Sequence, residues 1–325
     1  MLETVAQWAE KAGWIVAWGS PTVLEEVRGD IERRRLAGEI DAGFYAERLA
    51  SYMRQVSSEG VESLVVVAVP RPAHEVIFDA GDIRFAVVVP PTYAGNDDIA
   101  EGIRRRLESL LAGASVTRLI APVKAVASRL GVVKYGRNNI TYAPGFGSYH
   151  QLTAFLTSAP LDATPRFTPG PPAPADECDG CFACGGACPT GAIAEDRFLL
   201  HTERCLALFN ERVGPWPEWV SPSSHNCLVG CMACQDACPM NAGLLRVERL
   251  EPFFDPEETS VILGSEIPGD DPAWTRIRAK FAAMGLEGLE GLVGRNLRAL
   301  LEAECLGGRW HGRGLSYLSR FSPSL

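Results

Sequence analysis

Cysteines are the residues of this chain with the clearest chemical capacity. Nine of the ten lie between Cys178 and Cys238, and the first four of these follow the pattern C-x2-C-x2-C-x3-C before a proline. The last three positions of that pattern recur from Cys231 onward. Thiolates at this spacing bind two four-iron clusters, and the cysteine before the proline reaches the neighbouring cluster. The region therefore predicts two 4Fe-4S clusters and one-electron transfer.

Each predicted cluster has its own set of four thiolates. Cluster one is assigned to Cys178, Cys181, Cys184 and Cys238. Cluster two is assigned to Cys188, Cys231, Cys234 and a fourth ligand, either Cys205 or Cys227, of which we favour Cys205. A zinc ion needs only four ligands, so zinc does not account for seven cysteines at the spacing of these two motifs. Disulfides are not expected in a cytoplasmic chain.

The composition limits the partners of the protein. The chain of 325 residues has a formal charge of -9, and such an acidic chain gains little from the counterion release that drives nucleic-acid binding. Its arginine runs, 33–35 and 104–106, are interpreted as solvated helix faces. The most apolar stretches are far shorter than the roughly 20 residues that span a bilayer, and Glu3 and Glu10 do not fit a signal peptide. We expect a cytoplasmic protein with no membrane partner.

The elements that must position the cysteines begin well before them. Residues 1–60 show helix spacing, and the runs 63–69 and 84–89 are predicted as two strands of one sheet. The other expected elements are helices at 97–111 and 122–130 and a strand at 115–120. This alternation predicts a layered α/β domain over residues 1–165.

Six prolines between residues 159 and 177 favour extended backbone and mark a domain boundary. A ferredoxin-like unit is expected over residues 166–250, and a mostly helical tail over 251–325. Glycines from Gly285 to Gly294 predict a break between two helices in that tail.

A polar loop rich in glycine and aromatic residues runs from Gly131 to Tyr149. Its composition would let backbone approach a large flat ligand, although surface turns have similar sequences. The sequence has no motif for dinucleotides, P-loop phosphate binding or zinc peptidases. The residues singled out for cofactor binding are Tyr135, Gly136, Arg137, Asn138, Gly147, Ser148 and Tyr149.

Motifs in unbroken order over about residues 60–245 resemble the epoxyqueuosine reductases and their relatives, the reductive dehalogenases. They are Gly136-Arg137-Asn138, Gly147-Ser148-Tyr149, the segment ending in Pro160-Leu161, the four-cysteine motif, Arg204-Cys205 and the run from Gly230 to Pro239. The resemblance implies a nitroreductase-like α/β domain that binds cobalamin without a protein ligand on cobalt. It also implies a ferredoxin-like domain that feeds this cobalamin with electrons, and it supports Cys205 as a ligand.

The expected fold class is therefore α+β. A nitroreductase-like α/β cobalamin-binding domain is followed by a bacterial ferredoxin-like two-cluster domain and a helical tail. Two departures from the family pattern bear on the substrate. Val133 and Lys134 stand where the family has glycine and tryptophan, and residues 114–124 contain no carboxylate in place of the family's proton-donating aspartate. The family's carboxyl-terminal extension that contacts tRNA is not recognisable either.

The resemblance implies an oxidoreductase in which the clusters reduce cobalt to Co(I) and a nearby acid supplies a proton. The candidate catalytic residues are Tyr93, Asp97 and Asp98. The expected substrate is a small organic molecule or a nucleoside, with tRNA a less favoured partner, and electrons come from an external donor such as a ferredoxin or flavodoxin. The alternative is an iron-sulfur electron-transfer protein that reduces a separate corrinoid or redox enzyme.

Overall fold

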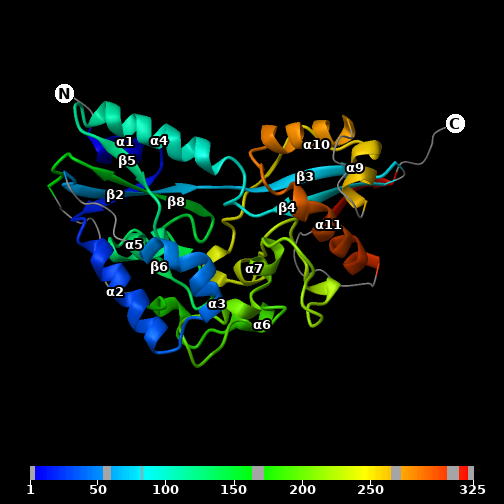
Figure 1. Ribbon diagram of the computed structural model, residues 1–325, viewed down its shortest axis with the longest axis horizontal. Coiled ribbons are helices and arrows are strands. Elements are labelled where there is room, and N and C mark those ends of the chain that lie inside the picture. The colour runs from blue at the N-terminus through cyan, green and yellow to red at the C-terminus, as the bar shows by residue number, and fades with distance from the viewer. Residues whose placement is uncertain are drawn as a thin grey trace.

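The computed structural model describes residues 4–53, 60–81, 83–162, 172–264, 272–305 and 315–320, whose strands form two larger sheets and a small hairpin (Figure 1). Sheet A has the strand order β1-β2-β8-β5 and is antiparallel throughout. Its strands are β1 (Ile15–Gly19), β2 (Ser63–Pro70), β5 (Val116–Leu119) and β8 (His150–Thr157). The sheet is central to the half of the molecule on the left of Figure 1.

Helices cover both faces of sheet A. They are α1 (Val5–Lys11) and α4 (Asn96–Leu110) on one face, and α2 (Val23–Leu36) and α5 (Val123–Arg129) on the other. Successive side chains of a strand point to opposite faces. In β2, Val65 and Val67 join the core under α1 and α4, and Val66 and Ala68 join the core under α2 and α5. A short helical segment follows α2 and consists of α3 (Ala42–Phe44), a π-helical turn (Tyr45–Leu49) and a 3-10 turn (Ala50–Met53).

Sheet B joins residues that are far apart in the sequence. Its order is β10-β4-β3-β9, with β3 and β9 parallel and the other pairs antiparallel. Its elements and the helices that pack on it are β3 (Ala73–Asp79), β4 (Ile83–Val89), β9 (Val247–Arg249), β10 (Leu315–Arg320), α9 (Pro256–Leu263), α10 (Pro272–Ala283) and α11 (Glu290–Cys305). Stacked rings of Phe78, Phe85 and Phe254 lie in this core. The core of sheet B therefore contains residues from all three predicted domains.

The cysteine-rich region is built from short elements joined by turns. They are η3 (Asp176–Cys178), α6 (Ala183–Ala187), η4 (Thr202–Arg204), α7 (Leu206–Asn210), η5 (Pro222–Ser224), α8 (Ala233–Asp236) and η6 (Pro239–Asn241). Helices α6 and α8 begin within the two cysteine motifs and pack against each other. Opposite them lies the hairpin of β6 (Lys134–Tyr135) and β7 (Thr141–Tyr142), which belongs to the polar loop before β8.

Several sequence predictions are confirmed, namely the mixed helix and sheet content, the two helices and the strand between residues 97 and 130, and the broken tail helix. Two are wrong. Residues 15–19 form an edge strand and not helix, because a β-branched and aromatic run follows the turn at Gly13. The predicted strands 63–69 and 84–89 lie in different sheets, because the chain leaves sheet A at Pro70. The predicted boundary at residues 165–166 lies outside the described residues.

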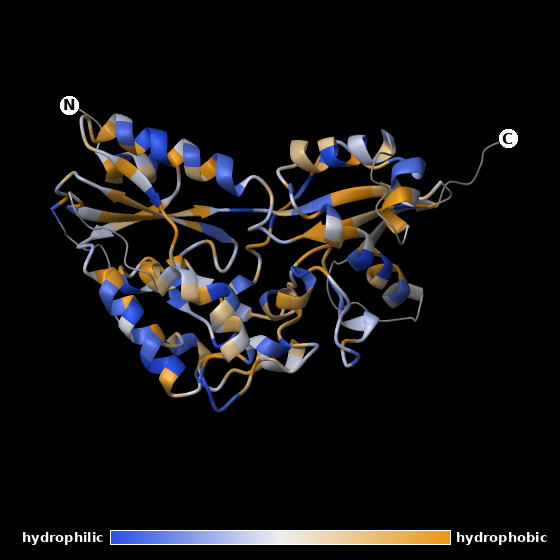
Figure 2. Ribbon diagram, in the orientation of Figure 1, coloured by the Kyte–Doolittle hydropathy of each residue, from blue (hydrophilic) through white to orange (hydrophobic). Residues whose placement is uncertain are grey.

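Apolar residues concentrate in the strands, and polar residues gather on the outward sides of the helices (Figure 2). This distribution places the cores at the sheet faces, as the burial of β2 and β4 also shows. Among the described residues, no helix combines the length and apolarity needed to cross a bilayer.

Candidate iron-sulfur centre and adjoining cavity

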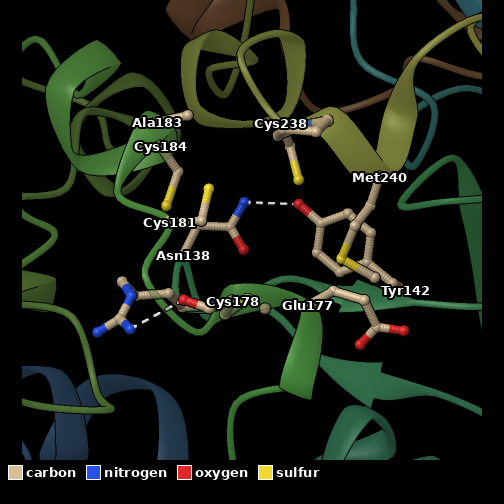
Figure 3. A pocket seen from close by; sticks show the side chains of 12 residues that line it. Asn138, Tyr142, Glu177, Cys178, Cys181, Ala183, Cys184, Cys238 and Met240 are labelled. Atoms are coloured by element: carbon tan, nitrogen blue, oxygen red, sulfur yellow. Dashed lines mark hydrogen bonds between the residues drawn. The ribbon is translucent and has the colours of Figure 1, made fainter.

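The four cysteines predicted for cluster one line a single cavity of about 270 Å³. Figure 3 shows the sulfur atoms of Cys181, Cys184 and Cys238 directed into the same space, with Cys178 on the neighbouring wall. These residues come from a loop, from α6 and from the turn after α8, so the fold gathers them from both cysteine motifs. Four thiolates converging on one cavity are the donor set that a 4Fe-4S cluster requires.

The second predicted set, Cys188, Cys205, Cys231 and Cys234, lies in a more enclosed place. Burial raises the pKa of the Cys231 thiol to about 12 and also raises the pKa of Cys205 and Cys234. The charge of Cys188 adds to the increase at all three thiols. Such thiols become thiolates when a metal cation replaces the proton. The set therefore suits a cluster with buried ligands.

Hydrogen-bond donors surround the sulfur atoms of both sets. The backbone N–H of Arg137 donates to Cys178 Sγ at 3.4 Å, and that of Ala192 donates to Cys188 Sγ at 3.3 Å. The side-chain amide of Asn226 donates to Cys231 Sγ at 3.1 Å. Hydrogen bonds to cluster sulfurs are one of the means by which a protein sets the reduction potential.

The structure gives Cys227 a different environment from that of the predicted ligands. It is buried in an apolar cluster with Val88, Tyr149 and Met232. Its thiol donates to Asn226 Oδ1 at 3.2 Å, and burial holds its pKa well above the usual range. A thiol packed in this way behaves as a small apolar side chain. These contacts favour Cys205 as the eighth ligand, and that assignment stays a prediction.

A second cavity of about 750 Å³ adjoins the predicted ligands of cluster two, because Cys205 is part of its wall. Its other walls come from α2, the helical segment after it, α5, the β6–β7 hairpin and β8. A volume of this size lies within the range of about 300 to 1,000 Å³ that is usual for sites of small molecules and cofactors. The cavity is thus large enough for an organic ligand beside a cluster.

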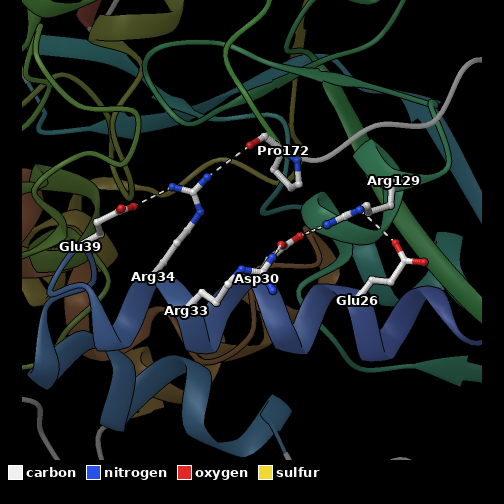
Figure 4. A network of polar contacts seen from close by, with 7 residues as sticks. All are labelled: Glu26, Asp30, Arg33, Arg34, Glu39, Arg129 and Pro172. Atoms are coloured by element: carbon white, nitrogen blue, oxygen red, sulfur yellow. Dashed lines mark hydrogen bonds and ion pairs between the residues drawn. The ribbon is translucent and has the colours of Figure 1, made fainter.

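A network of ion pairs holds the α2 wall of this cavity (Figure 4). Arg34 pairs with Glu39 at 2.7 Å and donates to the backbone oxygen of Pro172 at 3.4 Å. Asp30 pairs with Arg129 of α5. The network ties α2 to α5 and to the chain entering the cysteine-rich region, so three walls of the cavity are fixed relative to one another.

The residues predicted to bind a cofactor divide between the two cavities. Gly136, Arg137 and Asn138 line the cysteine cavity, whereas Tyr135 and Ser148 line the large one. The guanidinium of Arg137 donates to the backbone oxygens of Cys178 at 3.1 Å and Glu195 at 3.0 Å. Its position therefore supports a role in holding the first cysteine loop, and not the predicted contact with a corrin.

Gly147, Ser148 and Tyr149 connect the two parts of the molecule. Ser148 accepts a hydrogen bond from Asn241 Nδ2 at 2.8 Å and donates to Gln235 Oε1 at 2.9 Å. A Cβ added at Gly147 would overlap Asn241 Oδ1, which accepts from the backbone N–H of Ser148 at 2.8 Å. Tyr149 is buried against Cys227 and lines neither cavity. Gly147 and Ser148 thus dock the polar loop on the second cysteine motif.

We expect Gly147→Ala to lower the free energy of unfolding by about 2 to 4 kcal/mol. About 1 kcal/mol comes from the left-handed backbone, since φ is +58°, and the rest from the displaced Asn241 hydrogen bond. Gly145→Ala is the matched control, because φ is +75° there and a new Cβ meets nothing within 4 Å. Urea denaturation measures the free energy of unfolding of both variants. If that free energy fell equally in the two variants, the role of the Asn241 contact would be contradicted.

The predicted catalytic residues lie in different surroundings. Asp97 is 89% exposed and pairs with Arg118 at 2.6 Å, and Asp98 is also exposed on the first turn of α4. Neither aspartate lines a described cavity, so position gives their predicted role no support. The Tyr93 hydroxyl donates to Glu211 Oε1, and Glu211 lines the large cavity. The predicted role of Tyr93 therefore has an indirect link to the cavity.

Among the charged residues of the large cavity that sequence reasoning missed are Lys124 and Glu211. They are 87 positions apart in different elements, and no motif or spacing connects them. It also missed the docking role of Asn241, which follows the second Cys-Pro pair and offers an amide at a fixed distance from the ligands. The position of Asn241 just after the Cys-Pro pair was a signal that the sequence offered. The sequence offered no such signal for Lys124 and Glu211.

His150 at the start of β8 predicts a loss of stability in acid. Its Nδ1 donates to the Gly147 oxygen at 3.0 Å and its Nε2 accepts from Thr141 at 3.2 Å, and burial lowers its pKa to about 4. The unfolded chain, with an ordinary pKa of about 6.5, binds the proton first, so stability falls between pH 6.5 and 4 by up to about 3 kcal/mol. His150→Gln should reduce the dependence of melting temperature on pH in this window, and His201→Gln, at a partly exposed histidine, should not. An unchanged slope in His150→Gln would contradict this reading.

The fold and the two sets of cysteines define an iron-sulfur protein of mixed α and β structure. Residues 177–241 match the family model described as a 4Fe-4S double cluster binding domain. The chain is similar to curated epoxyqueuosine reductases: it is 34% identical over 140 residues to that of Bacillus cereus and 33% over 174 residues to that of Burkholderia pseudomallei. These matches cover 43% and 49% of this chain but only 35% and 42% of the relatives. The predicted resemblance to epoxyqueuosine reductases is confirmed.

Solved structures of epoxyqueuosine reductases share the fold. One, a complex with an epoxyqueuosine-modified tRNA stem loop, has a TM-score of 0.66 at 20% identity and covers 93% of this chain and 81% of that chain. The Bacillus subtilis enzyme has a TM-score of 0.64 at 20% identity, with 92% and 80% covered. At these identities the likeness concerns the fold.

Proposed function

We propose that this chain is a cobalamin-dependent iron-sulfur reductase whose two clusters deliver electrons to a cofactor in the large cavity. The observation that carries the proposal is the position of Cys205, which belongs to the predicted ligands of cluster two and also lines that cavity. A ligand bound there would lie beside the cluster that reduces it. The similarity to epoxyqueuosine reductases over the cysteine motifs supports the same reading.

The lining of the large cavity suits a ligand with many peripheral amides. Asn96, Asn139 and Gln151 line the cavity, and the side-chain amide of each has one enclosed polar atom without a partner among the described residues: Oδ1, Nδ2 and Oε1, respectively. Enclosed polar atoms without partners are costly, so a turn of these side chains toward the amides of a bound ligand would gain binding energy. Phe44, Leu49 and Tyr52 offer apolar surface opposite. We propose that these residues hold the corrin, whose cobalt supplies strongly reducing chemistry when bound.

The substrate proposed is a small organic molecule or a nucleoside. Both arginine runs are neutralised on their own helices, since Arg35 pairs with Glu32 at 2.6 Å and Arg104 with Glu101 at 2.8 Å. Arg33 likewise pairs with Asp30. Neither run offers the unpaired cations that hold phosphates. Reduction of a modified tRNA, for which a relative's complex is known, is thus a less favoured form of the same proposal.

An anaerobic titration of the reconstituted protein with cob(II)alamin tests the proposal, with EPR and with iron and sulfide counts. The expected result is one cobalamin per chain with a base-off cobalt signal, beside about eight irons in two four-iron clusters. No binding with both clusters intact would overturn the reductase reading. The protein would then be an iron-sulfur electron carrier that reduces a separate corrinoid or redox enzyme.

A further inference from the structure

Lys124 and Glu211 are charged residues of the large cavity that the proposed function has not used. Lys124 lies on α5, and its Nζ donates to the backbone oxygen of Asn139 at 3.1 Å. An ammonium group has three N–H donors, so two remain for the cavity. Glu211 follows α7, and the Tyr93 hydroxyl donates to one of its carboxylate oxygens. Each charged group is thus held at the wall by one fixed partner.

The other charged side chains of this cavity are engaged in ion pairs. Arg34 pairs with Glu39 at 2.7 Å, Arg48 with Glu47 at 3.0 Å, Arg118 with Asp97 at 2.6 Å and Asp30 with Arg129. Within the part of the chain that the structure describes, Lys124 is therefore the cationic lining residue without an ion-pair partner. Its ammonium protons are therefore not held in an ion pair.

The electrostatic surroundings of Lys124 are mixed. Lys124 is exposed at the cavity wall, where desolvation by the surrounding atoms lowers its pKa and the charge of Glu211 opposes this effect. The other titratable groups of the lining are His150, whose pKa burial lowers to about 4, and Tyr135, whose pKa burial raises. An acid works best when its pKa lies near the working pH.

We propose that Lys124 is the proton donor for the reduction carried out in this cavity, with Glu211 and Tyr93 as positioning residues. The inference rests on the proposed function. An organic acceptor takes two electrons, which an external reduced ferredoxin or flavodoxin supplies through the clusters. The Lys124 N–H bond breaks, and its proton bonds to the acceptor atom that gained the electron pair. Water supplies the second proton, and solvent reprotonates the amine.

The first test reads the lysine itself. The chain contains four lysines, Lys11, Lys124, Lys134 and Lys280. Selective ¹³C labelling of lysine Cε therefore gives few NMR signals, which Lys124→Arg and Lys134→Arg assign. We expect Lys124 to titrate below the usual range of a lysine, and Glu211→Gln to lower the pKa of Lys124 further, because an anion that favours the ammonium is lost. Glu218→Gln, an exposed acid, should leave it unmoved. Titration of Lys124 in the usual range of a lysine, or no response to Glu211→Gln, would overturn the proposal.

The second test reads proton transfer without a substrate. Protein loaded with hydroxocobalamin and reduced by titanium(III) citrate releases hydrogen as two electrons combine with two protons. Lys124→Ala should slow this release at least about 10-fold, the low end of what general acids contribute. Ethylamine should restore part of the rate, whereas Lys124→Arg should not, since a guanidinium does not give up its proton.

Lys134→Ala is the matched control, because Lys134 is an exposed surface lysine paired with Glu177 at 3.5 Å. Release at the wild-type rate in Lys124→Ala, with cobalamin and iron content retained, would overturn the proposal. Failure of the wild-type protein to bind cobalamin would instead overturn the proposed function, and the lysine titration would still decide whether Lys124 and Glu211 act as a pair.

Discussion

Cys205→Ser is expected to lower the iron content from about eight to about four per chain, because cluster two loses a thiolate that a hydroxyl replaces poorly. Reduction of bound cobalamin should be lost with it, since Cys205 also forms part of the wall of the large cavity. Iron and sulfide analysis measures the first effect. EPR of the protein reduced through its clusters measures the second, because the cob(II)alamin signal should persist in Cys205→Ser and disappear in the wild-type chain.

Cys227→Ala is the matched control for this experiment. Cys227 is buried among Val88, Tyr149 and Met232, so its loss removes a packing contact and not a ligand. We expect iron to stay at about eight per chain. The melting temperature should fall, because a buried sulfur atom leaves a small cavity. The reverse outcome, with iron lost in Cys227→Ala and kept in Cys205→Ser, would assign Cys227 to cluster two.

Ala125→Trp should weaken the binding of hydroxocobalamin at least about 100-fold, or 2.7 kcal/mol, while both clusters stay intact. Ala125 lies on α5 and lines the large cavity, so an indole ring there would occupy the space proposed for the corrin. Thr92→Trp does the same from another wall, where the side chain is exposed to the cavity and little packing is disturbed. Equilibrium titration followed by visible absorption measures the affinity.

Ala282→Trp is the control for added bulk, because Ala282 is exposed on α10, away from both cavities. It should bind hydroxocobalamin as the wild-type chain does. Wild-type affinity in both Ala125→Trp and Thr92→Trp would show that the cofactor binds elsewhere. If one variant lost iron, its cobalamin affinity could not be interpreted, and the affinity of the other variant would decide the test.

The sequence by itself determined the features that depend on neighbouring residues. Cysteine spacing predicted that Cys178, Cys181 and Cys184 line one cavity, because three thiolates separated by two residues can reach one point in any fold that bends at the motif. The 3.6-residue periodicity predicted α4 and α5, and glycines predicted the break between α10 and α11. All of these are short-range effects of backbone geometry and of side-chain spacing.

Only the tertiary structure decided which surfaces meet. The Gly136-Arg137-Asn138 turn faces the cysteine cavity, and Ser148 docks on Gln235 and Asn241, although the sequence predicted one common cofactor role for these residues. β2 and β4 look alike as sequences but belong to different sheets. Lys124 of α5 and Glu211, which follows α7, reach the same cavity. Contacts between distant segments depend on how whole sheets and helices pack together. The local periodicity of a sequence does not predict that packing.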